Sequence, residues 1–262
     1  MNIVVCIKQV PDSAAVLKVN EAGKVSWGDA PLIVNPWDDY AVEEALLIKE
    51  KHGGKVTAIT VGPESAKDAL KDPLAKGADA AVLLSDAAFA KLDSLGLATV
   101  LAAAVKKVGE VDMVLFGQSS IDAQTGMTAS AVARKLGCVP LTFVAKIRAI
   151  DPAARAITAE RLLEEGKQVV TTRLPAAVSV IKDINQPRYA SFMGIRKASK
   201  ATIPMWSASD LGVDAGAFVP RVDWSRTYAP PPREGACEMI TGDSPQAIAA
   251  ALANKIMAEK IL

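Results

Sequence analysis

Short apolar runs alternate with longer amphipathic stretches along the first half of the chain. Four runs rich in Val, Ile and Leu are typical of buried parallel strands: residues 3–7, 55–61, 80–84 and 111–116. The stretches around them have helical character at residues 36–52, about 66–75, 94–108 and 129–136. This alternation predicts right-handed crossovers and an α/β fold with a mostly parallel, doubly wound sheet. A small hairpin is expected at residues 16–27.

The segment Asn35-Pro36-Trp37-Asp38-Asp39 predicts the start of a helix. Asn35 is a suitable N-cap and Pro36 suits the first helical position. The two aspartates complement the helix dipole. Good capping alone would explain Asn35. Gly53 and Gly54 mark the expected end of this helix.

The pattern changes after Gly137, where a helix C-cap is expected. Strand-like stretches separated by turns predict an antiparallel extension and then one more buried strand, at residues 139–150, 157–163, 168–174 and 176–181. Residues 201–232 are too apolar for a free linker and too irregular for a compact domain, so we expect an arm over another subunit. A last helix is expected from Ser244. The predicted division is an α/β domain at residues 1–200 and a C-terminal arm with a helix at residues 201–262.

Composition narrows the class of protein. Half of the 262 residues are apolar, and 30 basic against 29 acidic side chains give a formal net charge of +1. This balance argues against nucleic acid as the main partner, because surfaces that follow phosphates are usually strongly basic. No apolar run approaches the ~20 residues of a membrane helix, so no direct membrane insertion is expected. The N-terminal run is strand-like rather than a signal peptide, which indicates a cytoplasmic location.

Few residues suit catalysis or metal binding. Cys6, Cys138 and Cys237 are far apart and form no CxxC pair, so each is expected to be a small buried hydrophobe. The one histidine, His52, is expected at the surface. GxGxxG, GxxxxGK[ST] and GxSxG motifs are missing, and no paired acid and base is evident. A binding or carrier role is therefore favoured over self-contained catalysis.

Residues 111–137 predict a strand, a small polar loop and a helix N-terminus. The first N–H groups of a helix lack internal partners and attract anions. Gln124, Thr125 and Thr128 add donors, and Gly126 permits close approach of the backbone. The loop can thus hold the phosphate of a nucleotide; the alternative is an ordinary turn capped by Thr and Asp. Lys8 follows the first strand, where ligands bind in open α/β sheets.

Residues 185–200 combine positive charge with apolar side chains. They include Arg188, Arg196 and Lys197 and no acidic residue, and Phe192 and Met193 are expected at the centre of a loop. An apolar tip ringed by positive charge suits docking to an acidic protein surface. The alternative is that Phe192 packs into the core of its own chain.

Several segments in order resemble the β subunit of electron transfer flavoprotein, a family that includes FixA. They are VVCIKQVPD at residues 4–12, VNPWDDYAVEEAL at 34–46, VGPESA at 61–66, KGADAAVLL at 76–84 and FGQSSIDAQTGMTA at 116–129. The most specific match is AERLLEEGKQVVTTRLPAAVSV at 159–180, followed by QPRYASFMGI at 186–195 and DLGVD at 210–214. The likeness runs along essentially the whole chain.

The resemblance implies a Rossmann-like domain of the adenine nucleotide hydrolase type and one half of a heterodimer. Such a β subunit pairs with the electron transfer flavoprotein α subunit, which its C-terminal arm wraps. The pair carries electrons from flavin dehydrogenases, such as acyl-CoA dehydrogenases, to a membrane quinone oxidoreductase or another acceptor. It is a carrier rather than an enzyme. The redox FAD is held mainly by the α subunit, and the β subunit binds a structural AMP.

The resemblance also implies site residues. The nucleotide would be held by Cys6, Lys8, Asn35, Pro36, Trp37, Asp38, Val61, Gly62, Asp122, Gln124, Thr125, Gly126, Met127 and Thr128. A partner-recognition loop at residues 186–200 would dock through Arg188, Tyr189, Phe192, Met193, Arg196 and Lys197. Its apolar anchor would be Phe192. No catalytic or metal-binding residue is implied.

Two alternatives are open. Electron-bifurcating relatives hold a second FAD where others hold AMP. The loop between Gly117 and Gln124 is shorter here than in relatives of either type, which argues against a second FAD because its pyrophosphate needs more loop donors. The other alternative is a stand-alone adenine-nucleotide-binding protein, which would form a stable homo-oligomer when expressed alone.

Overall fold

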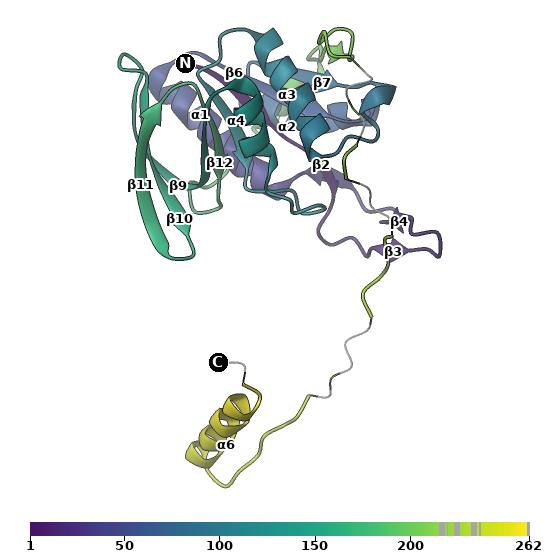
Figure 1. Cartoon of the computed structure of the whole chain (residues 1–262), viewed down its shortest axis with the longest axis vertical. Coiled ribbons are helices and arrows are strands. Elements are labelled where there is room, and N and C mark those ends of the chain that lie inside the picture. Colours follow the sequence, from purple (N-terminus) through teal and green to yellow (C-terminus); the bar gives the residue numbers. More distant parts are fainter. Residues whose placement is uncertain (215–217, 219, 223–225, 232–234, 236, 261–262) are drawn as a thin grey trace.

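The computed structural model describes residues 1–262 except 215–217, 219, 223–225, 232–234, 236 and 261–262. Within the described residues, nine strands form one sheet in the order β11-β10-β9-β12-β8-β1-β6-β7-β13 (Figure 1). The central strands are β12 (Ala176–Val180), β8 (Met113–Gly117), β1 (Asn2–Cys6), β6 (Lys55–Val61) and β7 (Ala80–Leu84). These neighbours are all paired in parallel. The predicted α/β fold with a mostly parallel sheet is confirmed.

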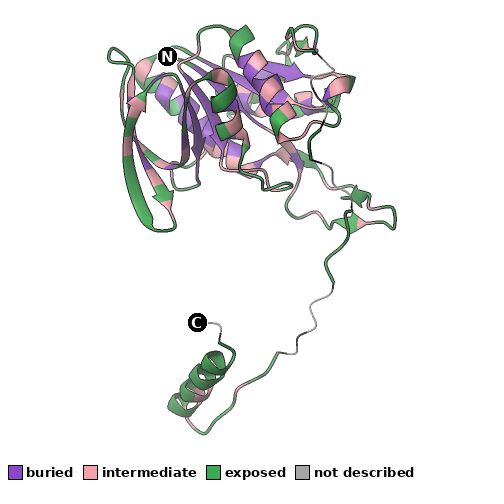
Figure 2. Cartoon of the chain, viewed as in Figure 1, coloured by how far each residue is buried: buried purple, intermediate pink, exposed green. Residues whose placement is uncertain are grey.

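Side chains of the central strands enter two hydrophobic clusters, one on each face of the sheet. Ile3 and Val5 of β1 pack in one cluster with α1 (Pro36–His52) and α2 (Lys67–Lys76). Val4 and Cys6 pack in the other with α3 (Ser94–Val108) and α4 (Thr128–Leu136). Because successive side chains of a strand point to opposite faces, helices cover both sides of the sheet. The sheet is doubly wound, and its central strands form the buried layer in Figure 2.

Local sequence signals set the helix ends. The side chain of Asp93 caps α3 by accepting a hydrogen bond from the backbone N–H of Gly96 at 2.8 Å. α4 ends at Gly137, whose φ of 69° lies in the left-handed region that glycine adopts easily. Short 3-10 turns, η1 (Glu64–Ala66) and η2 (Ala87–Phe89), precede α2 and α3. The predicted bounds of β6, β7 and α3 agree with those observed.

An antiparallel ribbon extends one edge of the parallel sheet. It consists of β9 (Val139–Asp151), β10 (Ala156–Leu163) and β11 (Gly166–Arg173), and β9 lies parallel to β12. The nearly buried carboxylate of Glu160 pairs across this ribbon with Arg148 at 2.6 Å and Lys167 at 2.9 Å. The predicted antiparallel extension is confirmed.

A small hairpin projects from the domain on the other side in Figure 1. β3 (Lys18–Val19) pairs with β4 (Val25–Ser26), between the strands of a second pair, β2 (Gln9–Pro11) and β5 (Leu32–Val34). The hairpin predicted at residues 16–27 is confirmed. The apolar side chains of Val16 and Leu17 beside it are exposed.

The sequence predicts a loop over residues 185–200, and this is wrong for the second half of that segment. Phe192–Ser199 form helix α5, capped by the hydroxyl of Ser191, which accepts a hydrogen bond from the backbone N–H of Gly194 at 3.0 Å. Strand β13 (Met205–Trp206) then pairs with β7, so the sheet continues beyond residue 200. The indole of Trp206 lies under the ammonium of Lys107, 5.1 Å from the ring centre.

The last part of the chain leaves the domain. In Figure 1, α6 (Pro245–Ala258) stands apart from the sheet, and none of its residues is buried. It starts at Ser244 as predicted, since the Ser244 hydroxyl accepts a hydrogen bond from Ala247 N–H at 3.2 Å. Trp224 and Pro232, assigned to the arm, lie outside the described residues. Cys237 is exposed and Cys138 half-buried, so the prediction of buried cysteines is right only for Cys6.

Candidate functional site

Three loops and a helix N-terminus meet at the carboxyl end of the parallel strands. Lys8 follows β1, Val61 and Gly62 end β6, and residues 118–127 follow β8, while α1 begins at Pro36. β1 lies between β6 and β8, so the loops after these strands are neighbours. Most of the residues predicted to hold a nucleotide therefore share one edge of the sheet, where α/β folds bind ligands.

The buried side chain of Asp38 connects the elements at this edge by hydrogen bonds. One of its carboxylate oxygens accepts the backbone N–H of Lys8 at 2.8 Å, and the other accepts that of Gly117 at 3.2 Å. The carboxyl is 7% exposed, and burial raises its pKa to about 7. The hydrogen bonds that it accepts lower the pKa only partly. Asp38 therefore joins the ends of β1 and β8 to the first turn of α1 rather than facing a ligand.

Asn35 holds the loop after β8. Its amide nitrogen donates to the carbonyl oxygen of Ser119 at 2.8 Å, and its amide oxygen accepts the N–H of Ile121 at 3.1 Å. The prediction that this side chain caps α1 is wrong, because it makes no capping hydrogen bond. Asn35 is 1% exposed, so these bonds to residues more than eighty positions away satisfy it in the core.

Gly117 is required by the close approach of α1 to the end of β8. A Cβ atom at this position would lie 2.5 Å from a carboxylate oxygen of Asp38 and 2.6 Å from the backbone carbon of Trp37. No side chain fits in that space without moving the backbone. The N-terminus of α1 is thus fixed directly against the start of the loop that Asn35 holds.

Lys8 and Asp122 form an ion pair across the mouth of the site. The ammonium lies 2.6 and 2.7 Å from the two carboxylate oxygens of Asp122. Burial alone would raise the pKa of Asp122, but hydrogen bonds from Lys8 and Ser120 bring it below its usual value. Lys8 is the one cation among the predicted nucleotide residues, and its charge is compensated within the chain.

The start of α4 leaves backbone donors free for a ligand. Its N-cap residue is Met127, which makes no side-chain capping bond, so the Thr and Asp side chains expected as caps do not cap this helix. Residues 122–127 are exposed, and Thr128 is half-buried in the first turn. Gln124 and Gly126 have φ values of 50° and 62°, which fold the loop back onto α4. The uncapped N–H groups and the nearby hydroxyls can bind an anion.

The remaining residues predicted to hold the nucleotide lie at the same edge of the sheet and are buried or half-buried. Pro36 and Trp37 are half-buried at the start of α1, as are Val61 and Gly62 at the end of β6. Cys6 is buried, and burial, followed by the charge of Asp38, raises the pKa of its thiol. Cys6 therefore contributes packing at this site and no thiolate. In the described part of the chain, no group of three His, Cys, Asp or Glu side chains could hold a metal ion.

Three of the predicted docking residues have large exposed side chains. Tyr189 is 98% exposed, Phe192 80% and Met193 69%. The alternative that Phe192 packs into its own core is wrong. Arg196 and Lys197 are exposed on α5. Arg188 differs from them, because its guanidinium is bound by Glu43 and Glu50 of α1.

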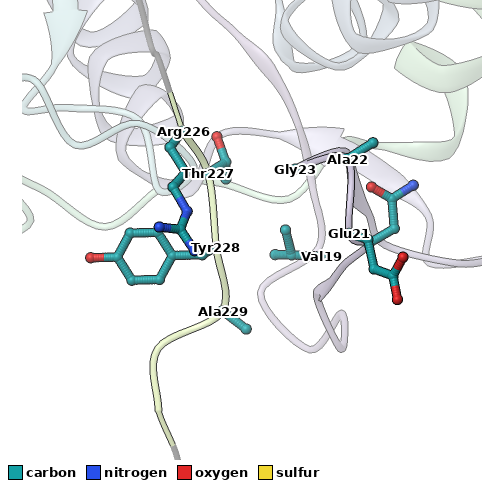
Figure 3. A pocket seen from close by; sticks show the side chains of 9 residues that line it. Val19, Glu21, Ala22, Gly23, Arg226, Thr227, Tyr228 and Ala229 are labelled. Carbon is teal, nitrogen blue, oxygen red and sulfur yellow. The ribbon is translucent and has the colours of Figure 1, made fainter.

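A cavity that sequence reasoning missed lies away from the predicted nucleotide residues (Figure 3). It has a volume of about 510 Å³ between the β3–β4 hairpin and residues 226–229 of the arm. Gly23 lies close to the arm, where a Cβ would be 3.1 Å from the carbonyl oxygen of Thr227. Nothing in the sequence marks this contact. None of the helices among the described residues is long and apolar enough to cross a membrane.

Comparison with known proteins places this arrangement in a family. The family model of the electron transfer flavoprotein domain matches residues 27–211. Protein FixA of Azorhizobium caulinodans is 43% identical over 218 residues, covering 82% of this chain and 78% of the relative. The electron transfer flavoprotein subunit beta of Clostridium acetobutylicum is 41% identical over 214 residues, covering 82% and 81%. The caffeyl-CoA reductase-Etf complex subunit CarD of Acetobacterium woodii is 36% identical over 266 residues, covering both chains fully.

These similarities, over most of each chain, identify a protein of the electron transfer flavoprotein class. The chain belongs to the electron transfer flavoprotein family, as a relative of its β subunits and FixA proteins. The resemblance stated from the sequence motifs is confirmed.

Proposed function

We propose that this chain is the β subunit of a heterodimeric electron transfer flavoprotein. It is a carrier subunit and not an enzyme by itself. It supports an FAD held mainly by the α subunit, and it accepts electrons from flavin dehydrogenases, such as acyl-CoA dehydrogenases, for delivery to a membrane quinone oxidoreductase or another acceptor. The similarity to an electron transfer flavoprotein β subunit over most of both chains supports this role.

The subunit binds AMP at the edge formed by Lys8, Asn35 and the loop after β8. The single observation that carries this assignment is the pair of hydrogen bonds in which the Asn35 amide donates to the carbonyl oxygen of Ser119 and accepts from the N–H of Ile121. These bonds hold the polar loop beside the uncapped start of α4, where phosphate oxygens would meet free N–H groups. AMP has no redox chemistry, so its role is structural.

The arm and α6 cover the α subunit. An exposed helix with apolar side chains needs a partner, since an isolated helix of this length is marginal in water. Leu252 and Met257 of α6 are 47% and 62% exposed. Wrapping by this arm explains why the helix folds without contacts in its own domain.

The test is the nucleotide content of the heterodimer purified after co-expression of both subunits. Nucleotides released by denaturation are separated by anion exchange. One FAD and one AMP per heterodimer are expected. Two FAD and no AMP would overturn the AMP assignment and establish the bifurcating type. A stable, active homo-oligomer of this chain alone would overturn the carrier role in favour of a stand-alone nucleotide-binding protein.

A second candidate is a subunit of a lasting complex with an oxidoreductase, with FAD in place of AMP. The full-length match to CarD, which is named as part of a reductase-Etf complex, favours it. Copurification of the native heterodimer separates the two candidates. A reductase retained in stoichiometric amount supports the second, and a free heterodimer supports the first.

A further inference from the structure

The segment that carries the docking side chains is attached to α1 before it reaches helix α5. The side-chain amide of Asn185 donates to the carbonyl oxygen of Tyr40 and to a carboxylate oxygen of Glu44, both at 3.0 Å. Glu44 is nearly buried, and burial raises the pKa of its carboxyl. Polar groups of α1 therefore fix the position of this segment where it leaves the sheet.

Arg188 makes the most extensive of these attachments. Its Nε and Nη2 donate to the carboxylate of Glu43 at 2.8 and 2.9 Å, and its backbone N–H donates to the same carboxylate at 3.0 Å. Its Nη1 and Nη2 donate to the carboxylate of Glu50, about two turns further along α1, at 2.5 and 3.2 Å. Glu43 is 5% exposed. A fork of this kind fixes the direction of the guanidinium as well as its position.

Helix α5 is held against α2 at its other side. A Cβ at Gly194 would overlap the carbonyl oxygen of Ala75, so the two backbones are in direct contact there. Ala198 is the buried residue of α5. Tyr189 lies directly after Arg188 and is 98% exposed, and Phe192 is 80% exposed at the start of α5. Apolar side chains thus stand out from a backbone that is fixed at both ends.

We propose that Arg188 is a positioning residue that clamps the docking segment to α1, and that it contributes no free charge to the encounter with a dehydrogenase. This inference rests on the proposed electron-carrier function. The charge that steers the partner then comes from Arg196, Lys197 and Lys200, for which the described residues provide no ion-pair partner within 4.0 Å. A segment that is already ordered loses less conformational entropy when it binds the dehydrogenase, so the clamp would increase the affinity.

The clamp and the docking-charge interpretations predict opposite effects of removing a carboxylate. Glu50→Ala leaves Arg188 with one partner and releases part of its charge. If Arg188 met the partner's acidic surface, this variant would lower the KM for the dehydrogenase. If Arg188 is a clamp, the KM rises by about tenfold with kcat and flavin content unchanged, because the apolar anchor is less well placed. Glu50 is partly exposed, so the variant is expected to fold.

Arg188→Lys tests geometry apart from charge. Lysine keeps the positive charge but cannot span two carboxylates as a planar fork. The clamp predicts a rise in KM similar to that of Glu50→Ala, whereas a docking charge predicts little change. Arg196→Gln is the comparison. The rate of electron transfer from the dehydrogenase should depend less on salt concentration in Arg196→Gln, and should keep the wild-type salt dependence in Arg188→Lys. Glu64→Gln, in the exposed pair with Lys67, is the matched control with no change expected.

Hydrogen exchange of the purified heterodimer gives a readout that does not depend on electron transfer. Amides of residues 189–199 should exchange faster in Glu50→Ala and Arg188→Lys than in the wild type, and equally in Glu64→Gln. Unchanged exchange together with unchanged KM would overturn the clamp. If the wild-type heterodimer transferred no electrons, the proposed function would fail, while the exchange rates would still decide whether Arg188 holds the segment.

Discussion

The ammonium of Lys8 lies 2.6 Å from a carboxylate oxygen of Asp122, so the one cation of the proposed nucleotide site is already neutralised by its own chain. Both side chains are partly exposed, at 44% and 35%, and the pair can open. An entering phosphate would compete with Asp122 for Lys8. The site therefore favours a nucleotide with little negative charge, such as a monophosphate.

Asp122→Asn should strengthen AMP binding. Removing the carboxylate frees Lys8 and relieves repulsion of the phosphate, and we expect a gain of about 1 kcal/mol, or roughly fivefold in Kd, for this partly exposed pair. Calorimetric titration of AMP into the nucleotide-free heterodimer measures the effect. Asp29→Asn, on the exposed hairpin, is the control. Weaker binding by Asp122→Asn would show that the carboxylate itself holds the ligand.

Asn35→Ala should loosen the loop after β8. The change removes two hydrogen bonds and leaves the N–H of Ile121 and the carbonyl of Ser119 without their partner, at an expected cost of about 1–3 kcal/mol in the free energy of unfolding. AMP retention should fall as well. Denaturant titration and nucleotide analysis measure the two effects, with exposed Asn254→Ala on α6 as the control. A loss of stability without any loss of AMP would remove this loop from the site.

Asp38 should make stability depend on pH. Burial raises its pKa from an ordinary 3.8 to about 7 in the folded chain, so the native state holds the proton more tightly than the unfolded state. Its contribution to stability is full below about pH 4, is lost as the pH rises toward 7, and is constant above it. The slope reaches about 1.4 kcal/mol per pH unit.

Denaturant titrations between pH 5 and pH 8 measure this contribution as the difference between wild type and Asp38→Asn. The asparagine variant has no titrating group at position 38, so the wild type should lose stability relative to it as the pH rises. A difference that stays constant over this range would mean that the carboxyl keeps an ordinary pKa despite its burial.

Gly117→Ala should destabilise the fold through backbone displacement. The new methyl group would press on Asp38 and Trp37 of α1, and overpacking of this kind typically costs about 1–3 kcal/mol. Thermal and denaturant unfolding measure the cost. Gly235→Ala is the matched control, because nothing lies within 4 Å of a Cβ there. Equal stability of the two variants would mean that α1 can retreat from β8 freely.

Phe192→Ala should slow electron transfer from the dehydrogenase without changing flavin content. Losing an exposed aromatic anchor at an interface is expected to lower kcat/KM by about tenfold or more. Steady-state rates at several heterodimer concentrations give the value. Leu95→Ala, a change of another exposed apolar side chain, on α3, should have no effect. Equal rates for Phe192→Ala and wild type would exclude Phe192 as the anchor.

Local patterns were sufficient for the parts of the fold that depend on nearby residues. Continuous apolar runs identify β6 and β7 because a strand buried on both faces needs them, and the Asp93 cap with Gly109 bounds α3. The same polar loop that suggests an anion site does lie at a helix N-terminus. These features need only a few consecutive residues to be visible.

The predictions failed where a side chain has a distant partner. Asn35 looks like a helix cap in sequence. In the structure its side-chain amide is instead hydrogen-bonded to two backbone groups of the loop after β8. Arg188 looks like a surface charge, yet Glu43 lies 145 positions away in the chain and beside it in space. Helix α5 was not predicted because Gly194 is a poor helix former. The close packing of α5 on α2 requires a glycine at this position.

Helix α5 sits on a crossover that leaves the interior of the sheet at β12 and returns at its far edge as β13, next to β7. Both ends of this strap are strands of one hydrogen-bonded layer, and its middle rests on α1 and α2. In the proposed complex, a load applied to Phe192 by a bound dehydrogenase would therefore pass to β12 and β13, which lie on opposite sides of β1 in the sheet. Under the proposed function, partner binding at Phe192 and the geometry of the proposed nucleotide edge would therefore be mechanically linked.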